Sequence, residues 1–173
     1  AAALIVNTLS PKTYTATALM RLVAEGRVEL DAPVRRYVPE LRLADEQAAA
    51  EVTVLNLLNH TAGLDWRINV DTGEGDDALA REVAALSEAK LLAPPGTRAS
   101  YSQAGYNLAG RILEKVTSLS YEQAIASLLL EPLGLAHSFF ARDDVMTRRF
   151  AVGHNLGTDG KPPADLFVKD GLH

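Results

Sequence analysis

Residues 94–117 read PPGTRASYSQAGYNLAGRILEKVT, a loop that leads into an amphipathic helix. Two prolines and a glycine restrict and redirect the backbone in the loop. The apolar residues that recur at the spacing of one helix face are Leu108, Ala109, Ile112, Leu113 and Val116. We therefore predict a helix over residues 104–117 that buries this face in a core.

Residues 9–20 read LSPKTYTATALM and predict the start of a second helix. Ser10 suits the capping position and Pro11 suits the first helical position. The helix is expected over about residues 11–25, with Gly26 ending it. The residues predicted to share its apolar side are Ala16, Leu19, Met20, Leu22 and Val23.

The remaining pattern is also mainly helical. The further predicted elements are a loop with one short helical turn over residues 28–41, a helix over residues 54–60 capped by Thr53, a helix over about residues 77–89, a helix opened by the capping-box residues Ser120 and Gln123, and a short strand over residues 4–9. The chain is therefore expected to be a single, helix-dominated domain over residues 1–173.

Composition excludes several classes of function. The 173 residues carry a net charge of −5, and their Lys and Arg residues are scattered beside Asp or Glu, so a nucleic-acid partner is not expected. The absence of cysteine excludes disulfides and thiolate metal sites. No apolar run approaches the roughly 20 residues that a membrane span needs. A soluble protein is expected, and the sequence leaves the cytoplasm, the periplasm and secretion open.

The sequence carries few signs of metal or cofactor chemistry. The four histidines are His60, His137, His154 and His173, and their spacing is not that of metal ligands. There is no G-x-S-x-G motif, no glycine-rich phosphate loop and no H-E-x-x-H. We therefore expect no histidine metal site, and each histidine is interpreted as a loop or cap residue.

Three segments in order carry a family resemblance. They are residues 10–41, residues 52–64 (VTVLNLLNHTAGL) and residues 94–117, and EPLGL follows at residues 131–135. Over residues 10–155 this set resembles the serine β-lactamase and penicillin-binding-protein superfamily, in particular its class C-like branch with esterases and D-aminopeptidases. The resemblance implies an α+β fold of the β-lactamase/transpeptidase type, of which this chain covers mainly the helical region with few strands.

The resemblance also assigns roles to individual residues. In this family a serine at the start of a buried helix attacks an amide or ester carbonyl, and a lysine or a tyrosine takes its proton. Because side chains alone activate the serine, the resemblance implies no metal and no organic cofactor. Lys12 matches the family lysine, and Tyr101 matches the tyrosine of the Y-x-N element. Gln103 stands where that element has asparagine, so it is the predicted substrate contact. HTAGL, residues 60–64, resembles the family's loop beside the cleft.

The two residues after this loop have two interpretations. Asp65 and Trp66 either line the cleft or belong to a solvated loop with one packed tryptophan. The sequence favours neither interpretation.

The nucleophile departs from the family pattern. The family spacing is S-x-x-K, but the residue three positions before Lys12 is Leu9, and Ser10 lies only two positions before it. Two helical positions differ by about 200°, so Ser10 and Lys12 would not share a helix face. Ser10 is therefore either the nucleophile or only a helix cap.

The ends of the chain also depart from the pattern. Family members carry strands at both ends, and one C-terminal strand bears K-T-G or H-x-G, which this sequence lacks. The chain is therefore expected to be either a piece of a longer hydrolase or a truncated relative. A helical region without its sheet exposes apolar surface, which predicts self-association or a partner that supplies strands.

Two functions are compatible with these features. The first is a serine hydrolase acting on a β-lactam, a D-amino-acid peptide or a carboxylic ester, with a small-molecule or peptide substrate. The second is a non-catalytic binding or assembly module, or an inactive fragment, that keeps the helical scaffold.

Overall fold

The computed structural model describes residues 11–68, 72–73, 75–140 and 147–148. The chain divides into two compact units, residues 9–135 and residues 1–8 with 136–173. The described helices all belong to the first unit. The interpretation of residues 1–173 as one domain stays a prediction, and the strand predicted at residues 4–9 lies outside the described residues.

The described part of the chain is helical, and its only β-type pairing is an isolated antiparallel bridge between Pro33 and Thr53. In chain order the elements are α1 (Pro11–Ala24), the 3₁₀ turn η1 (Val34–Arg36), α2 (Glu46–Glu51), α3 (Val54–Leu58), α4 (Ala78–Ala85), the 3₁₀ turn η2 (Leu86–Glu88), α5 (Gln103–Thr117), α6 (Tyr121–Ile125) and the π-helical η3 (Ala126–Leu130). No described helix is long and apolar enough to span a membrane.

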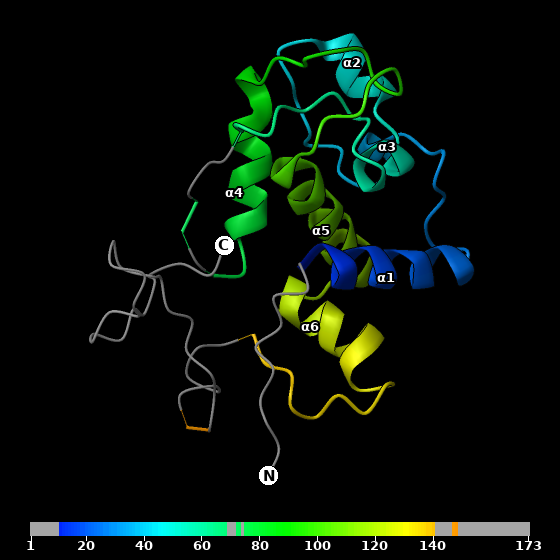
Figure 1. Cartoon of the computed structure of the whole chain (residues 1–173), viewed down its shortest axis with the longest axis vertical. Coiled ribbons are helices and arrows are strands. Elements are labelled where there is room, and N and C mark those ends of the chain that lie inside the picture. The colour runs from blue at the N-terminus through cyan, green and yellow to red at the C-terminus, as the bar shows by residue number, and fades with distance from the viewer. Residues whose placement is uncertain (1–10, 69–71, 74, 141–146, 149–173) are drawn as a thin grey trace, which may run out of the picture. The chain divides into compact units, whose positions relative to one another are not determined.

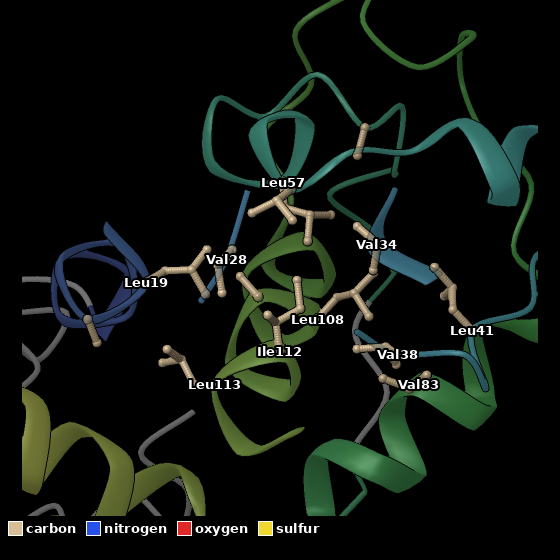
Figure 2. Close-up of a cluster of buried hydrophobic side chains, with 14 of the residues drawn as sticks. Leu19, Val28, Val34, Val38, Leu41, Leu57, Val83, Leu108, Ile112 and Leu113 are labelled. Carbon is tan, nitrogen blue, oxygen red and sulfur yellow. The ribbon is translucent and has the colours of Figure 1, made fainter. Parts of the chain in front are cut away.

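Helix α5 is the centre of the first unit, because it packs against α1, α3, α4 and α6 (Figure 1). Figure 2 shows its Leu108 and Ile112 among Leu19 of α1, Leu57 of α3 and Val83 of α4. Burying one such side chain contributes roughly 1.5–3 kcal/mol. The predicted apolar face of α5 is confirmed, with Val116 at its partly buried edge.

Capping residues set the helix starts where the sequence predicted them. The hydroxyls of Thr53 and Ser120 accept hydrogen bonds from the backbone N–H of Asn56 at 3.3 Å and Gln123 at 3.4 Å, and both form capping boxes. Gly26, with φ of +71°, follows the end of α1. These local signals are confirmed because a cap depends only on residues three positions apart.

The structure differs from the expected pattern in three details. Met20 is 44% exposed, because the buried face of α1 runs through Thr15, Ala18, Leu19 and Leu22, and Met20 lies about 100° from Leu19. The helix predicted over about residues 77–89 tightens into η2 at residue 86. Helix α2 was not predicted, although Asp45 caps it by accepting from the N–H groups of Gln47 and Ala48, each at 3.0 Å.

Candidate functional site

Three of the four predicted site residues meet where α1 and α5 begin. Lys12 lies in the first turn of α1, Gln103 is the first residue of α5, and Tyr101 precedes it by two positions. The Nζ of Lys12 donates a hydrogen bond to Oε1 of Gln103. The same nitrogen lies 4.8 Å from the ring centroid of Tyr101, which is a cation–π distance. The packing of α1 against α5 thus unites residues about 90 positions apart.

The loop that carries Tyr101 is held by the turn after α3. The backbone N–H of Ser100 donates to the carbonyl of His60 at 2.8 Å, and its hydroxyl donates to the carbonyl of Leu64 at 3.1 Å. The buried hydroxyl of Ser102 accepts from the N–H of Gly105 at 3.2 Å and caps α5. Hydrogen bonds of the two neighbouring residues, Ser100 and Ser102, therefore hold the backbone on both sides of Tyr101.

His60 completes an aromatic group that the sequence did not predict. Its ring lies 4.8 Å from the Tyr101 ring and 5.1 Å from the Tyr106 ring, centroid to centroid. Its Nδ1 accepts a hydrogen bond from the N–H of Ser102 at 3.2 Å. Burial, followed by the positive charge of Lys12, lowers the pKa of His60. A neutral imidazole is therefore favoured, which agrees with Nδ1 acting as an acceptor.

The two tyrosines beside Lys12 differ in the use of their hydroxyls. The hydroxyl of Tyr106 donates to the carbonyl of Leu58 at 3.0 Å, and burial, followed by the neighbouring Tyr101, raises its pKa. Tyr101 is 60% exposed, and its hydroxyl makes no hydrogen bond to another described residue. Of the two hydroxyls, that of Tyr101 is the one open to a substrate.

Gln103 extends the site into the protein. Its Nε2 donates to Oδ1 of Asn107 at 2.8 Å, and Asn107 in turn contacts Glu82 of α4. Neither Asn107 nor Glu82 was predicted as a site residue. The four-residue spacing of Gln103 and Asn107 on one helix was the available signal for Asn107, whereas Glu82 had no signal in the sequence.

The remaining predicted residues are not part of this group. Ser10 lies outside the described residues, so its role as nucleophile or cap stays a prediction. Trp66 is 66% exposed and is therefore not a packed tryptophan. Asp65 is buried and pairs with Arg67, whose side chain lowers the pKa of the Asp65 carboxyl. A cleft-lining role for Asp65 and Trp66 stays a prediction.

Metal binding has no support from the described residues. They contain no group of three or more His, Asp and Glu side chains that is placed to hold a metal ion. The expectation that the chain uses neither a metal nor a cofactor stays a prediction.

Comparison with known proteins gives consistent results. The β-lactamase family profile matches residues 11–172. Penicillin-binding protein 4 of Amycolatopsis lactamdurans is 40% identical over 153 residues, which cover 87% of this chain and 40% of that protein. Esterase EstB of Burkholderia gladioli is 33% identical over 176 residues, covering 93% of this chain and 43% of that protein.

A solved structure supports the same fold. The octameric penicillin-binding protein homologue from Pyrococcus abyssi matches with a TM-score of 0.68 and 34% identity, over 88% of this chain and 36% of that chain. This chain thus spans about two fifths of the length of the relatives that it matches.

Proposed function

Because the chain belongs to the β-lactamase family, we propose that it acts as a serine hydrolase that cleaves an amide or ester through an acyl-serine intermediate. The substrate classes are a β-lactam, a D-amino-acid peptide or a carboxylic ester. The observation that carries the proposal is the meeting of Lys12, Tyr101 and Gln103 at the N-termini of α1 and α5.

The proposed reaction has two halves. The Ser10 hydroxyl oxygen attacks the substrate carbonyl carbon, and the serine proton passes to the pair formed by Lys12 and Tyr101. The bond to the leaving amine or alcohol then breaks, and that group takes the proton. Water attacks the acyl-serine ester in the second half, which releases the carboxylic acid and restores the serine hydroxyl.

The side chains in this site suit different roles. The hydroxyl of the exposed Tyr101 has no hydrogen-bond partner among the described residues and can exchange a proton with the reacting groups. The Nζ of Lys12 lies 4.8 Å from the centroid of the Tyr101 ring, so both side chains are close enough to share the serine proton. Gln103 uses its amide oxygen for Lys12, and one hydrogen of its NH₂ group remains for a substrate carbonyl.

The test is covalent labelling of the folded chain with a tagged fluorophosphonate and a tagged penicillin, followed by peptide mapping. We expect the adduct on Ser10, and we expect Lys12→Ala and Tyr101→Phe each to slow labelling by about 10²–10⁴-fold. Tyr106→Phe is the matched control, because it removes a hydroxyl that is bound to the Leu58 carbonyl. It should label within about threefold of the wild-type rate while losing about 1 kcal/mol of stability.

A folded chain that gives no adduct on Ser10 rejects the proposal for this chain. That result, together with stable self-association, supports the second candidate, a non-catalytic assembly module. The octameric state of the Pyrococcus abyssi homologue is the observation that favours the second candidate.

A further inference from the structure

A chain of hydrogen bonds leads from Lys12 across α5 to a carboxylate on α4. Lys12 Nζ donates to Gln103 Oε1, and Gln103 Nε2 donates to Asn107 Oδ1 at 2.8 Å. Asn107 Nδ2 then donates to both carboxylate oxygens of Glu82, at 2.8 and 2.7 Å. Four side chains from three helices thus form one continuous polar path.

The path is built into the packing of α4 against α5. Gln103 and Asn107 are four residues apart on α5 and therefore share a face of that helix. Glu82 is only 7% exposed, so its carboxylate is held between the helices. Gly110 allows the close approach, because a Cβ at this position would lie 3.2 Å from Cδ1 of Leu79 on α4.

The ends of the path fix its direction. A lysine ammonium can only donate hydrogen bonds, and an ionised carboxylate can only accept them. Each amide between them has one donor end and one acceptor end. Only one orientation of Gln103 and Asn107 therefore pairs a donor with an acceptor at every contact. In that orientation the Gln103 oxygen faces Lys12 and its NH₂ group faces Asn107.

We infer that Glu82 and Asn107 are positioning residues that hold the Gln103 amide oxygen toward Lys12. The inference rests on the proposed function, in which Lys12 takes part in proton transfer. With Gln103 reversed, an NH₂ group would face the ammonium, and this hydrogen bond of Lys12 would be lost. The acceptor-only carboxylate at the far end of the path thus contributes to the position of the Lys12 side chain.

Two hydrogen bonds hold the Glu82 carboxyl despite its burial. Burial, partly offset by the hydrogen bond from Asn107, raises the pKa of the Glu82 carboxyl. Both carboxylate oxygens accept from the same NH₂ group, which stabilises the charged form against the cost of burial. The carboxylate and the Asn107 orientation therefore depend on each other.

The experiment moves the carboxylate from position 82 to position 107. Glu82→Gln replaces one of the two acceptor oxygens with a donor, so Asn107 Nδ2 loses one of its two hydrogen bonds and the path is held less firmly at this end. Adding Asn107→Asp restores the direction, because the introduced glutamine can donate to the introduced aspartate, which still accepts from Gln103. Both substitutions are isosteric, and the double variant keeps the net charge.

The first readout is hydrogen exchange of the Gln103 side-chain amide, measured by NMR on the ¹⁵N-labelled chain. In the wild type it should exchange at least about tenfold more slowly than the side-chain amide of the exposed Gln123. Glu82→Gln should remove most of this protection, and the double variant should restore it to within about threefold. Glu114→Gln removes an equally buried carboxylate of α5 outside the path, and it should leave the Gln103 amide unchanged.

The second readout is ester hydrolysis. Glu82→Gln should lower kcat about tenfold with KM within twofold, and the double variant should recover most of kcat. Wild-type exchange as fast as that of Gln123, or a double variant no better than Glu82→Gln, overturns the inference. A wild type that is protected but hydrolyses nothing overturns the proposed function alone. Hydrolysis with an unchanged kcat in Glu82→Gln overturns the inference alone.

Discussion

His60 lies against two tyrosine rings while its Nδ1 accepts a hydrogen bond from the N–H of Ser102. Only a neutral imidazole can accept at this nitrogen. The pKa of His60 is lowered from about 6.5 by burial and by Lys12, so the unfolded chain takes up the proton first as the pH falls. The stability that His60 provides is therefore complete above about pH 6.5, and it is lost as the pH falls through the folded-state pKa.

We expect His60→Asn to expose this dependence. Asparagine tolerates the positive φ of +61° at this position and does not titrate. At pH 7.5 the variant should be about 1 kcal/mol less stable than the wild type, because the imidazole contacts are lost. Urea unfolding from pH 7.5 to pH 5 should show the two proteins converging. A gap that stays constant over this range contradicts the role given to the neutral imidazole.

Residues of the site were predictable where a linear motif contains them. Lys12, Tyr101 and Gln103 were predicted because each belongs to an ordered segment of the family pattern, and the structure brings all three together. His60 was interpreted as a loop or cap residue, although it belongs to the HTAGL loop. Glu82 carries no local signal, because its partner Asn107 lies 25 positions away on another helix.

At the scale of elements, the site depends on how the turn after α3 meets the loop before α5. The N–H of Leu92 donates to the carbonyl of Gly63, and the N–H of Gly96 donates to the carbonyl of Thr61, both at 2.8 Å. Gly63 has φ of +80°, and a Cβ at this position would lie 2.2 Å from the carbonyl oxygen of Ala93. This contact has no room for a side chain.

Gly63→Ala should therefore lower the free energy of unfolding much more than Gly26→Ala does. Both glycines have positive φ, so each alanine variant incurs about 1–2 kcal/mol of backbone strain. A Cβ at Gly26 meets nothing within 4 Å, whereas at Gly63 it forces the two loops apart for about 1–3 kcal/mol more. Thermal unfolding of the two alanine variants measures the difference in their stability. Equal losses of stability in the two variants would show that the turn after α3 and the loop before α5 can separate freely.

Helices were predictable to the extent that their signals are local. Periodicity and caps gave α1, α3, α5 and α6 with nearly correct starts. The short α2 has a cap in Asp45 but no long apolar pattern, so it was missed. The change from α4 to η2 and the π-helical form of η3 depend on packing against other elements, which a local pattern does not contain.

At the scale of the whole molecule, the family assignment predicted from three segments is confirmed. The order of several weak motifs carried this prediction, since each motif alone is common. The chain covers about two fifths of its relatives, and the described residues contain no strand of the sheet that the family fold includes. The sequence predicts that self-association or a partner that supplies strands covers the helical surface, but it does not choose between the two.

We expect self-association of the chain to cover its exposed helical surface. Leu133 and Leu135, after η3, are 65% and 39% exposed, and exposed leucines of this kind favour contact with another apolar surface. Size-exclusion chromatography with light scattering should give a mass above the 18.6 kDa of one chain, increasing with concentration. Leu133→Asp should shift the mass toward the monomer without loss of stability, because the side chain is exposed. Leu92→Asp, which changes an exposed leucine on another loop, should not shift it. A monomer at every concentration contradicts the prediction and leaves these leucines to another partner.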